Sequence, residues 1–175
     1  DGTININDII TSINHSEDTH YAKTQLLCLE NTHNVCYGTA IPKQYFIDVK
    51  SAINQYNLKL HIDGVRIFNA SIALNTDVKE LTEQADSISC CLSKGLSCPS
   101  GSLIMGNKVF ITKARRLRKM LGGGMRQAGI LAAAGIYALD NMVHRIKQDH
   151  KNAKELADAI ANISNIEIDL NKVST

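Results

Sequence analysis

Short runs of consecutive apolar residues alternate along the chain with longer stretches in which apolar positions recur at helical spacing. Residues 25–30, 58–63 and 87–92 form three such runs, each bounded by polar segments, which is typical of buried strands. A fourth apolar run at 101–105 predicts another strand. We expect a further strand to begin at residues 166–170.

Helices are predicted between these strands. An isoleucine-rich pattern predicts a short helix over residues 4–14 that starts near Asn7 or Asp8. Pro42 suits the first turn of a helix that runs to about residue 57. Further helical stretches are expected from residue 66, at 78–83, at 109–119 and at 126–161, the last with a joint near Asn141 or Asp149 and preceded by a break at the glycines of 122–124.

This alternation predicts an α/β domain with a mostly parallel sheet that helices cover on both faces. In such sheets, ligands bind beyond the carboxyl ends of the strands. His33, Asp63, Arg66 and Lys94 all fall at or just past a predicted strand end. We therefore expect the functional site at that edge of the sheet.

Composition narrows the class of protein. A chain of 175 residues with 44% apolar and 21% charged residues is typical of one globular domain. A net charge of +2 gives no reason to expect a nucleic-acid or membrane partner, and no apolar run is long enough to span a bilayer. The chain shows no signal-peptide pattern, so we expect a cytosolic protein.

The five cysteines are odd in number, and none of them forms a Cys-x-x-Cys pair. Adjacent Cys90 and Cys91 would point to opposite faces of a strand, which is a poor arrangement for a disulfide. The pattern predicts reduced, partly buried thiols and no metal site.

Lys94 is the strongest candidate for chemistry. It follows an apolar strand and precedes Gly95, which would permit a ligand to approach closely. Loss of water around the amine would lower its pKa and allow it to form an imine with an aldehyde cofactor. A surface charge and a structural ion pair are the alternatives.

Asp63 and Arg66 form a second candidate group. A carboxylate at position 63 could hold a proton on a heterocyclic nitrogen, or it could cap the helix that follows. Arg66 could bind a substrate carboxylate through two hydrogen bonds, or it could pair with Asp63 itself. The pattern alone leaves these alternatives open.

The segment 113–119 carries five cations in seven residues, which could form a nucleic-acid patch. On a helix these cations spread around the axis, and no aromatic residues lie between them. We therefore favour a solvated helix face with one or two cations near a cofactor. The glycines that follow lack the Gly-Lys-Ser/Thr ending of a phosphate-binding loop and are interpreted as a flexible break.

Four segments resemble the threonine aldolases: residues 29–34 (LENTHN), 60–70 (LHIDGVRIFNA), 91–96 (CLSKGL) and 118–129 (RKMLGGGMRQAG). The resemblance runs in order through nearly the whole chain. It implies a pyridoxal-phosphate enzyme with the three-layer, aspartate-aminotransferase-like fold (fold type I).

The resemblance also implies roles for individual residues. Lys94 would form an aldimine with pyridoxal 5'-phosphate, and Asp63 would face the pyridine nitrogen. Arg66 would contact the cofactor and bind the substrate carboxylate. His20 would lie near the substrate hydroxyl and would orient that group or move its proton.

Lys119 and Arg126 match basic residues of the family that approach the site, from the cofactor side or from a neighbouring subunit. The reaction that the resemblance implies is retro-aldol cleavage of L-threonine or L-allo-threonine to glycine and acetaldehyde, in threonine catabolism and glycine biosynthesis. The partners expected are the amino-acid substrate and further copies of the chain, arranged as a dimer of dimers in the cytoplasm, with no nucleic acid and no membrane.

The family pattern also includes a cofactor-phosphate turn and a ring-stacking histidine that would precede Asp1. We therefore expect residues 1–142 to be a partial cofactor-binding large domain that lacks its N-terminal part, and 143–175 to be a connecting helix and the start of a small C-terminal domain. We expect exposed sheet edges that another chain or segment covers. The alternative is a truncated, catalytically inactive fragment that acts at most as an assembly module.

Overall fold

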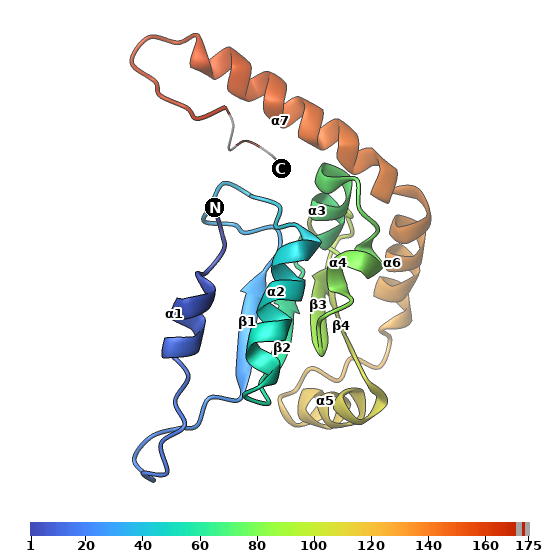
Figure 1. Ribbon diagram of the computed structural model, residues 1–175. Coiled ribbons are helices and arrows are strands. Elements are labelled where there is room, and N and C mark those ends of the chain that lie inside the picture. The colour runs from blue at the N-terminus through green and yellow to red at the C-terminus, as the bar shows by residue number, and fades with distance from the viewer. Residues whose placement is uncertain (171–172, 174–175) are drawn as a thin grey trace.

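The structure, a computed structural model, describes residues 1–170 and 173. Its centre is a four-stranded sheet in the order β1 (Leu26–Glu30), β2 (Lys59–Asp63), β3 (Ser87–Cys91) and β4 (Ser102–Gly106) (Figure 1). The first three strands are parallel, and β4 runs antiparallel to β3. The mostly parallel sheet is therefore confirmed, and these four predicted strands agree with the observed ones to within one residue.

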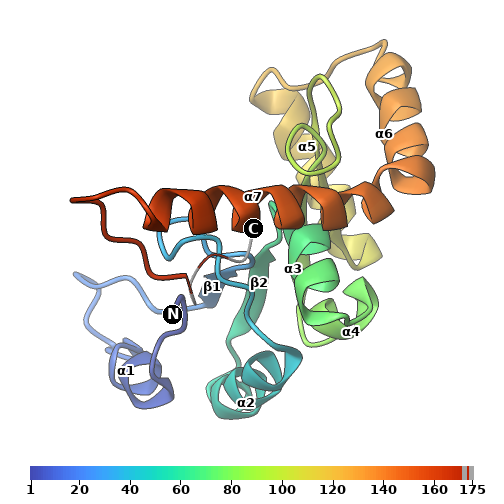
Figure 2. The ribbon, with the colours of Figure 1, turned by 90° about the horizontal axis from the view of Figure 1, so that it is seen from above.

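Helices connect and flank the strands. They are α1 (Ile6–Thr11), α2 (Lys43–Asn54), α3 (Ile67–Leu74), α4 (Val78–Thr82), α5 (Lys108–Met120), α6 (Gly129–Asn141), the 3-10 turn η1 (Val143–Arg145) and α7 (Ile146–Ala161). The joint predicted near Asn141 is confirmed, because α6 ends there and η1 separates it from α7. Helix α7 then passes over the carboxyl-end side of the sheet (Figures 1 and 2).

Helices α3 and α5 begin within one residue of the prediction, and the starts of α1, α2 and α6 differ from it for local reasons. Helix α1 begins at Ile6, because the Asn5 side chain accepts a hydrogen bond from the Asn7 amide at 2.9 Å and caps the helix. Pro42 is the extended residue that precedes α2, not part of its first turn. Helix α6 begins at Gly129 instead of residue 126, because the residues before it form a turn.

The strand predicted at residues 166–170 is wrong. Residues 166–169 have no regular secondary structure, and residue 170 lies in a turn. This segment follows α7 and lies away from the sheet (Figure 1). A strand needs a neighbour that pairs with its backbone amides and carbonyls, and an apolar run without such a neighbour stays irregular.

The main core fixes β1 and β2 side by side. Helices α1 and α2 pack on one face of these strands (Figure 2). From α2, the side chains of Phe46, Val49 and Ile53 are fully buried against Leu60 and Ile62 of β2. Burial of such side chains contributes roughly 1.5–3 kcal/mol each. The carboxyl ends of the two strands are therefore held in register next to each other.

A second core cluster holds α3, α4 and α6 against the end of β3. It contains Ile67 of α3, Leu81 of α4 and Ala138 of α6. These residues pack with Leu92 and Leu96, which follow β3 and are 3% and 2% exposed. This cluster therefore anchors the segment that carries Lys94.

The other face of the sheet is more open than predicted. Leu26 and Ile104 are each 50% exposed, and all five residues of β4 are exposed. The sequence predicts that helices cover both faces of the sheet, but in the described part of the chain they cover this second face only in part. Helices α5 and α6 also expose large apolar side chains, namely Val109, Leu117, Met120, Ile130, Ile136, Tyr137 and Leu139. The described residues leave these side chains uncovered.

The cysteines are all free thiols, as the sequence predicts. Cys90 and Cys98 are buried, and burial raises the pKa of the Cys90 thiol to about 11. A thiol with so high a pKa is a poor nucleophile. Among the described residues, no helix is both long and apolar enough to cross a membrane.

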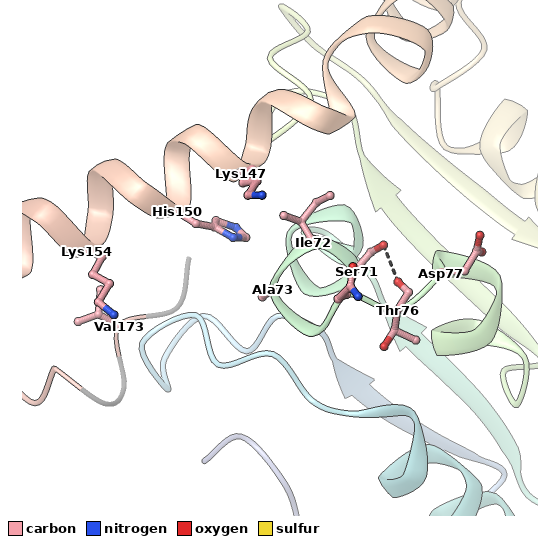
Figure 3. Close-up of a pocket in the computed structure, with 10 residues that line it drawn as sticks. Ser71, Ile72, Ala73, Thr76, Asp77, Lys147, His150, Lys154 and Val173 are labelled. Atoms are coloured by element: carbon pink, nitrogen blue, oxygen red, sulfur yellow. Dashed lines mark hydrogen bonds between the residues drawn. The ribbon is translucent and has the colours of Figure 1, made fainter.

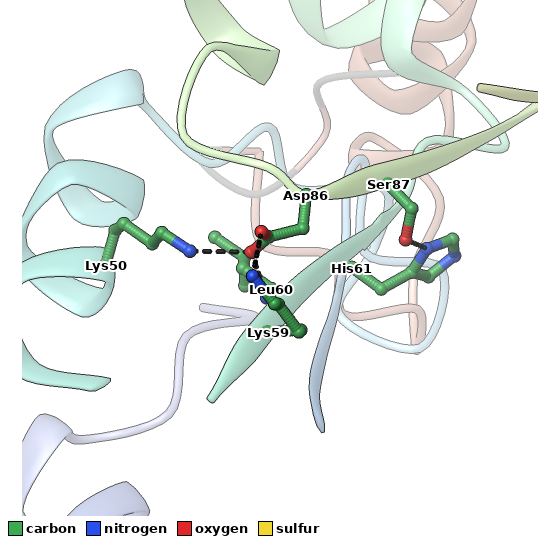
Figure 4. A network of polar contacts seen from close by, with 6 residues as sticks. All are labelled: Lys50, Lys59, Leu60, His61, Asp86 and Ser87. Atoms are coloured by element: carbon green, nitrogen blue, oxygen red, sulfur yellow. Dashed lines mark hydrogen bonds and ion pairs between the residues drawn. The ribbon is translucent and has the colours of Figure 1, made fainter. Parts of the chain in front are cut away.

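Asp86, directly before β3, connects the amino ends of β2 and β3 through polar contacts (Figure 4). Its carboxylate accepts hydrogen bonds from Lys50 Nζ at 2.6 Å, Lys59 Nζ at 3.0 Å and the Leu60 amide at 2.9 Å. Burial raises the pKa of Asp86, but these three donors outweigh it and hold the pKa at about 2. Helix α2, strand β2 and the start of β3 therefore share one ionic contact.

Asp86→Asn is expected to destabilise the fold by about 1–2 kcal/mol at pH 7, after allowance for solvent screening. Because the folded pKa lies below the unfolded value of 3.8, the contribution is complete above about pH 4–5 and is lost as the pH falls towards 2. Urea unfolding of both proteins across this range measures it. The control is Asp48→Asn, on the exposed side of α2. If the difference in free energy of unfolding between Asp86→Asn and wild type does not shrink at low pH, the ionised Asp86 carboxylate does not stabilise the fold.

Candidate active site

The carboxyl ends of β1, β2 and β3 meet at one edge of the sheet. In the register of the parallel strands, Glu30 lies beside Asp63, and Asp63 lies beside Ser89. The Asn31 amide donates to the Asp63 carbonyl and the Gly64 amide to the Ser89 carbonyl, each at 2.9 Å. Backbone pairing thus continues past the strand ends and fixes the position of Asp63.

The Asp63 carboxylate points toward β3. Ser89 Oγ donates a hydrogen bond to Asp63 Oδ1 at 2.8 Å. Arg66, not Asp63, directly precedes α3, and no side chain caps that helix. Asp63 takes part in none of the ion pairs found among the described residues. Both structural alternatives for Asp63, a helix cap and a pair with Arg66, are therefore not realised in this part of the chain.

Gly64 is required by the close approach of two strands. A Cβ atom at Gly64 would lie 2.7 Å from the Ser89 carbonyl oxygen, which is backbone and cannot move away without disturbing β3. A side chain here would therefore separate Asp63 from Ser89. Arg66 follows at the start of α3 and is half-buried.

Lys94 lies in a tight turn directly after β3. The Cys98 amide donates to the Leu92 carbonyl at 3.0 Å, and the Ser97 amide donates to the Lys94 carbonyl at 2.7 Å. Lys94 is exposed between the buried side chains of Leu92 and Leu96. It belongs to none of the ion pairs among the described residues, so the ion-pair alternative is not realised there. Its exposure matches the surface-charge alternative, and within one chain the expected loss of water around the amine is not provided.

Three residues at this edge were missed by the sequence reasoning. Ser89 holds Asp63, and the period-two alternation of the strand could have placed it on the same face. Buried Asn31 binds both the amide and the carbonyl of Ile41 at 3.0 Å, which shapes the loop after β1. Thr32 Oγ1 is buried and has no hydrogen-bond partner among the described residues. Asn31 and Thr32 belong to the family-like segment 29–34, but that motif does not indicate the Asn31–Ile41 hydrogen bonds or the burial of the Thr32 hydroxyl.

His33, which the sequence also placed at this edge, is held by local contacts. Its Nδ1 accepts from the Cys36 amide at 3.3 Å, and its Nε2 lies 4.0 Å from Glu30 Oε2. The imidazole therefore orders the loop that follows β1.

The structure places His20 apart from these residues. It belongs to the segment between α1 and β1. Figure 1 shows that this segment extends beyond the amino ends of the strands. Its side chain is 87% exposed, and its Nδ1 is 2.6 Å from Asp18 Oδ1. Within one chain, His20 is thus not brought to the edge that carries Asp63.

Lys119 and Arg126 also lie at the other end of the sheet. Gly106, which ends β4, pairs with Ser87 at the amino end of β3, and α5 begins two residues later. Lys119 is in the last turn of α5 and folds over Gly124, where a Cβ would lie 2.9 Å from Lys119 Cδ. Arg126 is exposed in the turn before α6. The chain therefore gathers Asp63, Arg66 and Lys94 at one edge and holds the other three candidates elsewhere.

A cavity of about 820 Å³ lies between the end of α3 and α7 (Figure 3). Ser71 and Thr76 line it from the α3 side, and Lys147, His150 and Lys154 line it from α7. None of the predicted site residues lines this cavity, so it is distinct from the strand edge. The described residues also contain no group of three or more His, Cys, Asp or Glu side chains that could hold a metal ion.

The strand edge has the donor set that pyridoxal phosphate requires. That cofactor needs an amine for its aldehyde and a carboxylate for its ring nitrogen. Lys94 presents an exposed amine, and Asp63 presents a carboxylate that a hydrogen bond from Ser89 orients. The buried Thr32 hydroxyl adds a polar atom that a ligand at this edge could satisfy. The residues present therefore fit the cofactor.

Comparison with known proteins finds relatives that match nearly the whole chain. The family model described as beta-eliminating lyase matches residues 1–175. The chain is 49% identical to the low specificity L-threonine aldolase of Escherichia coli strain K12, over 91% of this chain and 47% of that protein. It is 44% identical to low-specificity L-threonine aldolase 1 of Arabidopsis thaliana, over 100% of this chain and 49% of that protein. The chain spans about half the length of the curated relatives it matches.

Solved structures confirm the predicted fold. The threonine aldolase of Leishmania major superposes with a TM-score of 0.75 at 21% identity, over 92% of this chain and 47% of that chain. An aminotransferase of Helicobacter pylori superposes with a TM-score of 0.61 at 19% identity, over 87% of this chain and 45% of that chain. The sheet and its helices are therefore arranged as in aminotransferase-like proteins.

Proposed function

The chain belongs to the β-eliminating lyase family, and from this premise we propose that it carries the catalytic lysine of a pyridoxal-phosphate-dependent threonine aldolase. The proposed reaction is cleavage of L-threonine or L-allo-threonine to glycine and acetaldehyde. The observation that carries the proposal is the edge at which Asp63, held by Ser89, and the exposed Lys94 follow neighbouring parallel strands. The names of the relatives support the substrate class.

Pyridoxal phosphate, when bound, supplies an electron sink that stabilises negative charge on Cα. Lys94 would hold the cofactor through its amine. Asp63 would keep a proton on the ring nitrogen, and the 2.8 Å hydrogen bond from Ser89 Oγ would orient its carboxylate for that role. In this account Asp63 and Ser89 would together stabilise the positive charge on the ring nitrogen.

Arg66 would bind the substrate carboxylate through the two parallel N–H donors of its guanidinium. His20 would accept the proton of the β-hydroxyl as the Cα–Cβ bond breaks. The hydroxyl oxygen then becomes the aldehyde oxygen, and Cα takes up a proton to give glycine. In this role the protein would degrade threonine and supply glycine.

His20, Lys119 and Arg126 require a second copy of the chain in this account. The α1–β1 segment contains His20, and α5 and the turn after it contain Lys119 and Arg126. These segments lie at the end of the sheet away from the carboxyl ends of the parallel strands (Figure 1). The exposed apolar side chains of α5 and α6 provide a surface that a second copy could cover. We therefore propose a homo-oligomer, built as a dimer of dimers, in which each site takes His20 and the basic residues from a neighbouring subunit.

Mixing of two inactive variants tests the shared site. His20→Ala chains and Lys94→Ala chains, co-expressed in equal amounts as the natural gene product that contains this chain, should recover about a quarter of wild-type activity. Half of the random dimers then contain one chain of each kind, and one of their two sites is intact. Acetaldehyde formation in a coupled assay measures the recovery.

The matched control mixes Lys94→Ala with Asp63→Asn. Both residues lie at the same edge of one chain, so no mixed dimer contains an intact site and no activity returns. If the His20 pair also stays inactive on mixing, the site does not take His20 from a neighbour.

The alternative function is that of an assembly module without catalysis, which the exposed apolar surface of α5 and α6 favours. The two functions differ in cofactor uptake. A purified protein that assembles but shows no absorbance change with pyridoxal phosphate would support the alternative.

A further inference from the structure

Asn69 is a polar side chain buried inside an otherwise apolar helix face. It is 7% exposed, and its helix neighbours Ile67 and Ala70 are 2% and 0% exposed. Burial of an amide is unfavourable unless hydrogen bonds replace those to water. The contacts of Asn69 therefore indicate what it holds in place.

The Asn69 amide contacts two separate parts of the chain. Its Nδ2 lies 3.2 Å from Nε2 of His150, which α7 directs toward α3 (Figure 3). Its Oδ1 packs against Gly95 so closely that a Cβ atom at Gly95 would lie only 2.4 Å from it. One side chain thus touches both α7 and the residue next to Lys94.

The contact with His150 has a defined direction. The side-chain NH₂ group of Asn69 can donate a hydrogen bond but cannot accept one. Nε2 of a neutral imidazole is therefore the acceptor. Burial lowers the pKa of His150, while the nearby charge of Asp149 opposes the shift. A lowered pKa favours the neutral ring that this hydrogen bond needs.

The contact with Gly95 explains why a glycine follows Lys94. Gly95 has no positive φ, so its backbone conformation is accessible to any residue. Space is the constraint instead, and the Asn69 amide fills that space. The turn is closed by two backbone hydrogen bonds and anchored by the apolar side chains of Leu92 and Leu96. Asn69 adds a polar side-chain contact to the backbone beside Lys94.

We propose that Asn69 is a positioning residue: it fixes the Lys94–Gly95 turn and couples that turn, through His150, to helix α7. The contacts stand independently of the reaction, whereas the importance of the turn rests on the proposed function of Lys94. A shift of the Lys94 backbone would misplace the amine at the strand edge. Helix α7 therefore contributes to the site without touching it.

Hydrogen exchange of the turn amides tests the contact in the absence of cofactor. In Asn69→Ala, and in His150→Ala, the Ser97 and Cys98 amides should exchange at least about tenfold faster, while the α2 amides stay unchanged. These two amides close the Lys94 turn through the Lys94 and Leu92 carbonyls. Unchanged exchange at both amides would overturn the proposal.

A pair of glycine substitutions tests the contact more sharply. Gly95→Ala should lower the urea midpoint, because its Cβ clashes with Asn69 Oδ1. Adding Asn69→Ala should remove this clash. The double variant should therefore lose less free energy of unfolding than the two single variants lose together. The matched control is Gly64→Ala, which meets the backbone oxygen of Ser89 and cannot be relieved by Asn69→Ala. The proposal is contradicted if the losses in free energy of unfolding of Gly95→Ala and Asn69→Ala simply add. It is also contradicted if Asn69→Ala relieves the loss caused by Gly64→Ala to the same extent.

Activity of the natural gene product that contains this chain separates positioning from folding. In Asn69→Ala, kcat should fall between about 10- and 100-fold while KM changes less than about threefold. An unchanged kcat, despite a loosened turn, would overturn the positioning role. If the wild-type protein has no aldolase activity, the proposed function fails, and the exchange and double-variant results still decide whether Asn69 holds the turn.

Discussion

Lys94→Ala is expected to lower aldolase activity by more than about 10³-fold, because it removes the amine that holds the cofactor and can transfer a proton. Lys94 is exposed and forms no ion pair among the described residues, so its loss should leave the fold intact. Acetaldehyde release measures the activity, and circular dichroism measures the fold.

The matched control for this substitution is Lys79→Ala, at another exposed lysine, on α4. It should leave the activity within about twofold of wild type, as is usual for surface substitutions. Substantial aldolase activity in a folded Lys94→Ala protein would remove Lys94 from the proposed mechanism.

Asp63→Asn is the substitution with the second-largest expected effect, a loss of roughly 10²- to 10³-fold in kcat. Asparagine has nearly the same shape, and its oxygen can still accept from Ser89, so the edge of the sheet should keep its geometry. The loss arises because a neutral amide cannot stabilise the positive charge of a protonated ring nitrogen.

Asp48→Asn provides the comparison, because it makes the same chemical change on the exposed side of α2 and should leave kcat unaltered. Ser89→Ala should give a milder loss of about tenfold, since Asp63 keeps its charge but loses the donor that orients it. If Asp63→Asn retains full kcat, the carboxylate does not face the cofactor ring.

The strands could be predicted from the sequence because each is a short apolar run whose buried residues pack against a helix. Leu60 and Ile62 in β2 are examples, both fully buried. The position of the candidate site followed from the same pattern, because parallel strands bring their carboxyl ends to one edge. Asp63 and Lys94 could therefore be assigned to that edge from the order of the segments alone.

The contacts that hold these residues could not be predicted. Ser89 meets Asp63 only because of the register between β2 and β3, and Asn69 meets His150 across a long sequence separation. The period-two alternation assigns Ser89 to a face of the sheet but not to the register beside Asp63, and no periodic signal relates Asn69 to His150. The strand expected at 166–170 failed for a related reason, since apolar character alone does not supply a pairing partner.

The central claim is that Lys94 is the residue that holds the cofactor. Borohydride reduction of the protein with pyridoxal phosphate, followed by peptide mass mapping, tests it most directly, because reduction makes an amine–aldehyde linkage permanent. The account predicts one modified peptide that contains Lys94, with the modification lost in Lys94→Ala. A modification that falls on other lysines, or that persists unchanged in Lys94→Ala, would contradict the account.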